Sequence, residues 1–79
     1  MPEIKWSIIR NLAVIGKGNG GWNKEVNIIS WNEKKPKVDI RSWDEEHKKM
    51  GKGITFTKEE IMALKALLEA TTADSLEIE

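Results

Sequence analysis

The amino-acid sequence predicts an α+β fold in which a four-stranded antiparallel sheet is followed by one C-terminal helix (β-β-β-β-α). Two observations support this fold class. Up to residue 56, runs rich in Val, Ile and Leu alternate with turn-forming residues, as in strands joined by short loops. From residue 57 on, apolar residues recur at helical spacing instead. The chain has 79 residues and no internal repeat or linker, so one unit is expected.

Turn-forming residues set the limits of the strands. The glycine-rich stretch 16–21 ends the first strand and predicts a flexible loop. Residues 32–36 contain Asn and Pro and suit a hairpin connection, and the charged stretch 44–51 predicts a loop before a short last strand. The four expected strands therefore span residues 4–15, 25–31, 37–43 and 53–56.

A capping signal marks the start of the helix. Thr57 is expected as the N-cap with Glu60 as its capping-box partner, and Phe56 and Ile61 are spaced for a hydrophobic staple. The helix is expected to fray near residues 71–72, so the domain spans 1–72 and an acidic tail spans 73–79. One apolar face is expected on the helix, formed by Ile61, Leu64, Leu67 and Leu68 with Met62 at its edge.

The composition excludes several classes of protein. Without Cys the chain has neither disulfides nor a thiolate zinc site. No apolar run approaches the roughly 20 residues of a membrane span, and residues 1–5 lack the pattern of a signal peptide. We therefore expect a cytoplasmic protein with no membrane partner.

A formal net charge of zero hides an uneven distribution. Residues 1–56 hold eleven cations and seven anions, a net charge of +4, whereas residues 57–79 hold two cations and six anions, a net charge of −4. Such asymmetry is typical of a chain whose basic part faces nucleic acid.

Strand alternation predicts which side chains share a face of the sheet. Val26, Ile28, Val38 and Ile40 are expected on the core face, together with Trp6, Ile8, Leu12 and Val14 of the first strand. The single helix covers only one face. The opposite face is therefore expected to be open to solvent or a partner, and it carries Asn27, Ile29, Trp31, Lys37, Asp39, Arg41 and Trp43.

Aromatic and cationic side chains on an open face suit single-stranded nucleic acid, because indoles stack on bases while cations hold phosphates. Trp31 and Trp43 are the stacking candidates, and Trp22 follows the glycine loop. The alternative for these residues is burial in an interface or under loops. Arg41 is the main phosphate candidate, with an ion pair to Asp39 or Glu25 as its alternative, and Lys24, Lys37 and Lys52 are further candidates.

Enzymatic function finds little support, so no catalytic residue, metal, cofactor or small-molecule substrate is expected. His47 is the only histidine and lies in a charged loop, where a solvated side chain is expected, like those of Lys48 and Lys49. The carboxylates at 44–46 lack the spacing of a calcium loop. The glycine run 16–21 leads into a strand, whereas a phosphate-binding loop leads into a helix.

Several ordered segments resemble a known family. The segments 37–43 (KVDIRSW) and 51–57 (GKGITFT), followed by an amphipathic helix, are similar to the C-terminal domain of the transcriptional positive cofactor 4 family of single-stranded DNA-binding coactivators. The segments 21–27 (GWNKEVN), 29–32 (ISWN) and 49–54 (KMGKGI) resemble the bacterial YdbC-type members more closely. The resemblance spans roughly residues 4–70.

The resemblance implies a homodimer in which the helices pair at the centre and two curved four-stranded sheets bind single strands. Arg41 and Lys52 then correspond to family cations that contact the DNA backbone, and Trp31 and Trp43 lie next to family aromatic positions. We expect no Ser-rich regulatory N-terminal region like that of the eukaryotic coactivators.

The function predicted is therefore largely sequence-independent binding of single-stranded DNA, with RNA as a second partner, in transcription, replication or repair. The protein would then associate with the nucleoid when bound. The alternative is a protein-interaction module that binds a peptide on its Trp-bearing sheet face.

Overall fold

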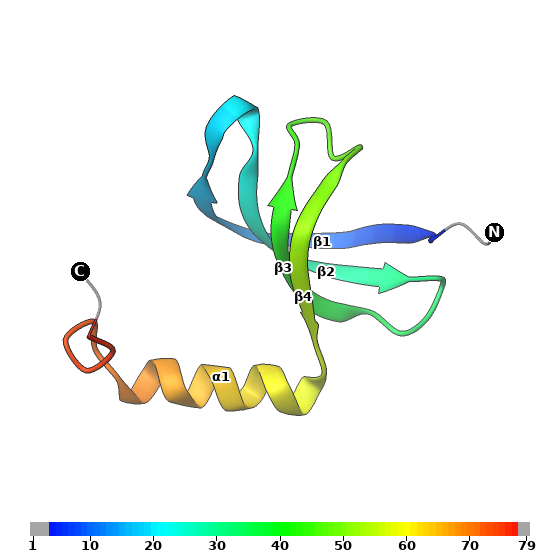
Figure 1. Cartoon of the computed structure of the whole chain (residues 1–79). Helices are drawn as coiled ribbons and strands as arrows, with labels where there is room; N and C mark the ends of the chain where they lie inside the picture. The colour runs from blue at the N-terminus through cyan, green and yellow to red at the C-terminus, as the bar shows by residue number, and fades with distance from the viewer. Residues whose placement is uncertain (1–3, 78–79) are drawn as a thin grey trace.

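The computed structural model describes residues 4–77 and contains one sheet and one α-helix. The strands are β1 (Trp6–Lys17), β2 (Asn23–Trp31), β3 (Lys37–Trp43) and β4 (Met50–Phe56), and the helix is α1 (Lys58–Ala70). The strands pair antiparallel in the order β1-β2-β3-β4, so β1 and β4 form the two edges of an open sheet (Figure 1). This architecture confirms the predicted α+β class and element order.

Two loop predictions needed correction. β4 begins at Met50, so the predicted loop 44–51 is shorter and the last strand is longer than expected. The glycine-rich stretch is not a flexible loop throughout: β1 continues to Lys17 and a 3-10 turn follows at Asn19–Gly21. Gly20 and Gly21 adopt φ values of 67° and 80°, a conformation that glycine adopts at little cost, and this closes the β1–β2 hairpin.

The β2–β3 connection is a tight turn, as its composition predicted. The backbone N–H of Lys34 donates to the Trp31 carbonyl at 2.9 Å. Asn32 and Glu33 between them have φ values of 51° and 62°. Positive φ at both central positions defines a turn whose twist matches that of paired strands. The turn therefore holds Lys34 and Lys35 close to the end of β2.

Three irregularities in β1 curve the sheet. The register with β2 shifts between Ile8 and Arg10, between Asn11 and Ala13, and between Val14 and Gly16. Ile9, Leu12 and Ile15 are the extra residues at these bulges, and they are 57%, 43% and 57% exposed. Bulges bend a strand and increase its twist. Figure 1 shows β1 and β2 bending sharply along their length.

The bulges also explain an error in the prediction for β1. Strict alternation placed Trp6, Ile8, Leu12 and Val14 on one core face, but each bulge shifts the alternation by one residue. Leu12 and Val14 are 43% and 48% exposed rather than buried. Trp6 is half-buried and is paired with Trp31 of β2.

The two faces of the sheet have the predicted membership in β2 and β3 but not the predicted burial. Because directly paired residues share a face, the register defines an inner face, which the sheet curves around. Its members are Trp6, Ile8, Asn11, Val14, Lys17, Asn23, Glu25, Asn27, Ile29, Trp31, Lys37, Asp39, Arg41, Trp43, Met50, Gly53 and Thr55.

The most buried side chains lie on this inner face, which was expected to be open. Ile29, Trp43, Asn27 and Asp39 are each 0% exposed. Val26, Ile28, Val38 and Ile40 on the outer face are only half-buried. The expectation that the aliphatic face forms the core is thus wrong for the single chain. The physical reason is the curvature, which encloses the inner face while the helix leaves much of the outer face uncovered.

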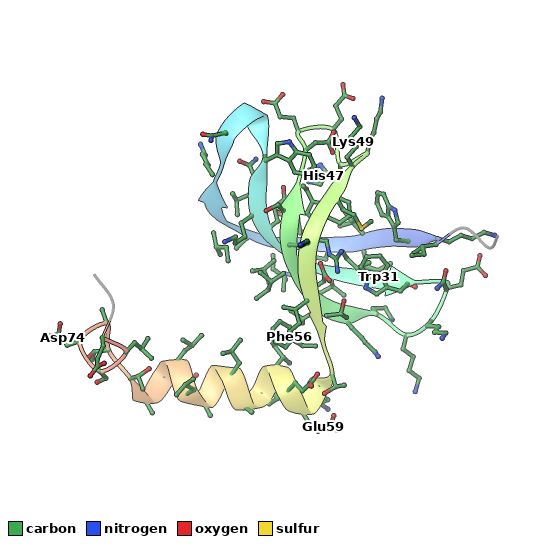
Figure 2. All side chains as sticks on the ribbon, viewed as in Figure 1. Trp31, His47, Lys49, Phe56, Glu59 and Asp74 are labelled. Atoms are coloured by element: carbon green, nitrogen blue, oxygen red, sulfur yellow. The ribbon has the colours of Figure 1, made fainter. Side chains whose placement is uncertain are left out.

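The helix begins as predicted but does not lie along the sheet. Thr57 Oγ1 accepts from the Glu60 N–H at 3.1 Å and Glu60 Oε1 accepts from the Thr57 N–H at 2.8 Å, which confirms the capping box. Phe56 lies at the junction of β4 and α1 (Figure 2) and lines one small pocket with Ile61, as the predicted staple requires. Beyond this first turn the helix points away from the sheet (Figure 1).

The projecting helix leaves apolar side chains in solvent. Met62, Leu67 and Leu68 are 52%, 49% and 54% exposed. The radius of gyration is 14.2 Å, whereas a compact chain of this length has a radius of about 12 Å. The predicted apolar face of α1 is therefore present, but within the described part of the chain only its first turn, at Ile61, lies against the sheet, and Leu67 and Leu68 are left exposed.

The predicted acidic tail is partly structured. After the helix, Thr72 caps a turn, because its Oγ1 accepts from the Ser75 N–H at 3.2 Å and its carbonyl accepts from the Leu76 N–H at 3.0 Å. The end of the tail, 78–79, lies outside the described residues. Within residues 4–77 no helix is long and apolar enough to cross a membrane.

Candidate nucleic-acid interface

One end of the inner face forms a groove of about 650 Å³, here called the lysine groove. It lies where β2 ends, at Trp31, which is labelled in Figure 2. Four of its lining residues are cations and none is acidic, so its charge is strongly positive in a chain with no net charge. The lining residues are Ile4, Trp6, Trp31, Asn32, Lys34, Lys35, Lys37, Arg41, Met50 and Thr55.

Trp31 is one of the two aromatic side chains that line this groove, the other being Trp6. Trp31 ends β2, just before the tight turn, and is half-buried. The Arg41 guanidinium carbon lies 4.8 Å from the centroid of its ring, in a cation–π contact. The indole of Trp31 thus has a cation against it and a groove beside it, which is the environment expected of a stacking residue.

Arg41 is largely committed to contacts within the protein. Its Nε donates to Asp39 Oδ1 at 2.7 Å and its Nη2 donates to Asp39 Oδ2 at 2.9 Å, a bidentate pair. Its Nη1 lies 3.4 Å from both the Gly51 carbonyl oxygen and the Met50 sulfur. Its side chain is only 14% exposed. The alternative considered for Arg41, an ion pair with Asp39, is therefore what the structure contains.

Neighbouring residues in turn hold Asp39. Its side chain is 0% exposed, and Thr55 Oγ1 donates to its Oδ2 at 2.7 Å. Gly53 lies opposite Arg41 in the register, where any Cβ would overlap the Arg41 Cβ. Only glycine at position 53 leaves room for the Arg41 side chain. The Arg41–Asp39–Thr55 group therefore supports Trp31 from the β3–β4 side.

Three lysines supply the exposed charge of the groove. Lys34 and Lys35 lie in the β2–β3 turn and Lys37 begins β3, and all three are exposed. Among residues 4–77, none of the three has an ion-pair partner within 4.0 Å. Their charges are available to an anionic ligand, unlike that of Arg41.

A second, polar groove of about 400 Å³ lies farther along the inner face. It is lined by Ile8, Asn11, Val14, Asn23, Glu25, Asn27 and His47. Glu25 is 3% exposed, and His47 Nε2 lies 2.9 Å from each of its carboxylate oxygens. His47 was expected to be a solvated loop residue; its side chain is 38% exposed, as that expectation requires, but its ring also contacts the buried carboxylate of Glu25.

Trp43 was expected on an open face and is instead fully buried. It is 0% exposed, and its ring centroid lies 4.9 Å from that of Trp6 and 5.7 Å from that of His47. The prediction that Trp43 shares a face with Trp31 and Arg41 was correct, but the curved β1 strand and the β3–β4 loop cover its indole. Trp43 packs in the core between the two grooves, with no exposed surface for a base.

The other three predicted binding residues lie away from the lysine groove. Lys24 pairs with Ser42 on the outer face and is exposed. Lys52 is exposed at the irregular part of β4. Trp22 is half-buried after the 3-10 turn, and its ring lies near Gly51. Of the seven predicted binding residues, Trp31, Lys37 and Arg41 are the ones that the structure brings together.

The start of the β3–β4 loop is organised by one carboxylate. Asp44 Oδ1 accepts from the backbone N–H groups of Lys49 and Lys48, both at 2.8 Å. These hydrogen bonds, first that of Lys49, hold the pKa of Asp44 below its ordinary value of 3.8. Lys48 and Lys49 themselves are exposed, as predicted. Asp44 thus fixes the loop that carries His47.

Sequence reasoning missed seven of the ten residues that line the lysine groove. Trp6 was assigned to the core, and Lys34 and Lys35 were treated only as turn residues. Met50 and Thr55 were not considered because β4 was expected to be shorter and its pairing was unknown. The cluster of lysines beside Trp31 was the available signal, because a hairpin turn places them next to the end of β2.

Residues 4–77 contain no group of three or more His, Asp or Glu side chains placed to hold a metal ion. The carboxylates of Glu25 and Asp39 are instead paired with His47 and Arg41.

Comparison with known proteins identifies the family. The family model "Transcriptional Coactivator p15 (PC4)" matches residues 19–67, which is more than half of the chain. A protein of Treponema pallidum (strain Nichols), named "Uncharacterized protein", is 39% identical over 72 residues, which cover 91% of this chain and 85% of the relative. The matched region contains β2, β3, β4 and most of α1, including Trp31, Lys37 and Arg41. The chain therefore belongs to the Transcriptional Coactivator p15 (PC4) family.

Proposed function

We propose that this protein is a homodimeric, largely sequence-independent single-stranded DNA-binding protein, and that the lysine groove is its main contact with the strand. The observation that carries the proposal is the lining of this groove: two indoles, three exposed lysines and no carboxylate. Membership of the Transcriptional Coactivator p15 (PC4) family supports the same function. We expect neither catalysis nor a cofactor, and a cytoplasmic location with association to the nucleoid.

The residues of the lysine groove are proposed to bind different parts of the strand, according to their chemistry. A base stacks on Trp31, and a stacked base contributes about 1–3 kcal/mol on any sequence because every base has a π-face. Lys34, Lys35 and Lys37 bind phosphates. Arg41 stabilises the position of Trp31 rather than serving as a free phosphate ligand, because Asp39 already compensates its charge.

Dimerisation is proposed from the apolar surface that one chain leaves exposed. Ile54 on the outer face of β4 is 56% exposed, and Leu68 of α1 is 54% exposed. Burial of apolar surface stabilises by about 25 cal/mol per Å². A second copy that packs its helix against this surface supplies the core that the single chain lacks. Its expected mass is 18.0 kDa, twice the 9.0 kDa of one chain.

The proposal is tested by titrating the protein with oligo-dT at low salt while recording tryptophan fluorescence. A bound base next to Trp31 is expected to quench part of the emission, whereas buried Trp43 is expected to keep its signal. Parallel titrations with duplex DNA of matched length are expected to bind more weakly, because paired bases cannot reach the indole. Matched RNA determines whether a ribose strand is a second partner. Absence of any quench and of any gel shift with oligo-dT would reject the function.

The rival function, capture of a peptide on the same face, gives a different result. A peptide that relies on the indoles is expected to bind with little dependence on salt. An oligonucleotide must release counterions from its phosphates and weakens steeply as salt rises. If phosphate contact is the mechanism, oligonucleotides of unrelated sequence bind with similar affinity, and neutralising the lysines weakens the binding of every one of them. Peptide recognition gives neither result.

A further inference from the structure

The side-chain amide of Asn11 is held by two buried acceptors of the polar groove. Its Nδ2 donates to Asn27 Oδ1 at 2.7 Å and to Glu25 Oε1 at 3.1 Å. Asn27 Nδ2 in turn donates to Glu25 Oε1 at 3.2 Å. The three side chains come from β1 and β2, where Asn11 and Asn27 are directly paired. Both N–H groups of the Asn11 amide are therefore used inside the protein.

This network fixes which end of the Asn11 amide faces outward. If the amide were flipped, its oxygen would face the oxygen of Asn27 and the carboxylate of Glu25. Asn27 and Glu25 are 0% and 3% exposed, so neither acceptor can turn to water. A buried acceptor left without a donor is costly. The carbonyl oxygen of Asn11 must therefore point away from the pair.

The outward oxygen of Asn11 lies in a site that suits a nucleobase. Asn11 is exposed and lines the polar groove, and among the described residues no hydrogen bond reaches its Oδ1. Ile8 and Val14 line the same groove and offer apolar surface to the flat face of a base. The groove volume of about 400 Å³ is in the range of small-molecule sites.

The two grooves are adjacent along β1. Trp6 lines the lysine groove and Ile8, two residues on along the same face, lines the polar groove. A strand stacked on Trp31 and followed along the inner face therefore places a later base beside Asn11. This step rests on the proposed function.

We propose that Asn11 is a base-reading residue: its fixed carbonyl oxygen accepts a hydrogen bond from the exocyclic amine of a base. The site then prefers cytosine and adenine to thymine and uracil, which present carbonyl oxygens at the corresponding position. The neighbouring carboxylate of Glu25 disfavours those carbonyl oxygens further. The result is a moderate base preference added to binding that is otherwise independent of sequence.

Oligo-dC and oligo-dU of equal length are the probes that isolate this contact. They share the backbone and the ring size, and cytosine has an amine at ring position 4 where uracil has a carbonyl. At mildly alkaline pH, the wild-type protein is expected to bind oligo-dC about three- to tenfold more tightly, the range of one neutral hydrogen bond. Equal affinities, or tighter binding of oligo-dU, would overturn the inference while leaving the proposed function intact. Absence of binding to both strands would instead reject the proposed function.

Substitutions then assign the preference to Asn11. Asn11→Ala is expected to reduce the dC/dU ratio to about one, with oligo-dU affinity nearly unchanged. Asn23→Ala is the matched control, because Asn23 lines the same groove without a side-chain hydrogen bond in the described part of the chain and its amide can present either end. This control is expected to keep the wild-type ratio. A ratio unchanged in Asn11→Ala would overturn the assignment.

A second variant covers the case in which Asn11→Ala does not fold. Asn11→Ser places a hydroxyl that both donates and accepts, so it is expected to accept both bases and to remove the preference. Circular dichroism spectra of each variant establish that it is folded. If Asn11→Ser still preferred oligo-dC as strongly as the wild-type protein does, this would count against Asn11 as the base-reading residue.

Discussion

The ion pair between Arg41 and Asp39 gives the sharpest prediction about the fold beneath the groove. In the variant Arg41→Gln, the Asp39 carboxylate loses its bidentate partner and retains only the hydroxyl of Thr55. Asp39 is 0% exposed and Arg41 only 14%, so water cannot replace the guanidinium without opening the sheet. Removing one partner of a buried pair costs about 3–5 kcal/mol.

That cost is a large part of the stability of a domain this small. At 0.05–0.15 kcal/mol per residue, a chain of 79 residues has a free energy of unfolding of roughly 4–12 kcal/mol. Urea denaturation followed by circular dichroism measures the change. With a slope of about 1–3 kcal/mol per molar, the midpoint is expected to fall by about 1 M or more. All variants are compared at one protein concentration, because the proposed dimerisation would make stability depend on concentration.

The double variant Asp39→Asn/Arg41→Gln is the control. It removes both charges together, so the buried carboxylate is no longer left alone, and it is expected to recover at least half of the loss. The structural role assigned to the pair would be refuted if Arg41→Gln lowered the free energy of unfolding by less than about 1 kcal/mol. It would also be refuted if the loss in the double variant equalled the sum of the losses in Arg41→Gln and Asp39→Asn.

Three further predictions concern the groove, the loop and the helix. Trp31→Ala is expected to weaken oligo-dT binding about five- to 150-fold, the effect of one lost stack of 1–3 kcal/mol, whereas Trp31→Phe retains part of it; equal affinity of wild type and Trp31→Ala in fluorescence anisotropy would contradict stacking. Because the folded-state pKa of Asp44 lies below 3.8, its ionised form stabilises the β3–β4 loop above that pH, and the contribution is lost as pH falls through the folded-state pKa. Asp44→Asn is therefore expected to lower the urea midpoint at neutral pH and to match wild type in strong acid; a gap that persists in acid would contradict this. Leu68→Glu is expected to lower the mass in light scattering from 18.0 to 9.0 kDa; an unchanged 18.0 kDa would argue against a helix-mediated dimer.

The fold class was predictable because its signals are local. The capping box of Thr57 and Glu60 and the turn at residues 32–36 depend on a few neighbouring residues, and both are present as expected. The prediction of which side chains share a face was also correct for β2 and β3, because the register that joins these two strands contains no bulge. These features require no knowledge of distant contacts.

The burial of the two faces was not predictable in the same way. It depends on the bulges at Ile9, Leu12 and Ile15, whose side chains resemble ordinary strand residues in the sequence. Once β1 curves, Trp43 is covered and His47 reaches Glu25, although 22 residues separate that pair. Long-range pairing of this kind decided which charged residues are free and which are compensated.

The consequence for the site is a change in the role of individual cations. Arg41 was expected to be the main phosphate ligand, and its pairing with Asp39 is the alternative that had been considered less favourable. Lys34 and Lys35 were regarded only as turn residues, yet they are the exposed cations closest in sequence to Trp31. Composition identified a basic half of the chain, whereas only the fold separates its free charges from its paired ones.

The salt dependence of oligo-dT binding tests the central claim most directly. Three exposed lysines in the groove predict a slope of log affinity against log salt of about −2 per groove, at 0.7 per phosphate contact on a single strand. The triple variant Lys34→Gln/Lys35→Gln/Lys37→Gln is expected to abolish most of this slope, whereas Lys24→Gln, on the outer face, is expected to leave it unchanged. A triple variant that keeps the wild-type affinity and slope would contradict the claim that this groove binds the strand.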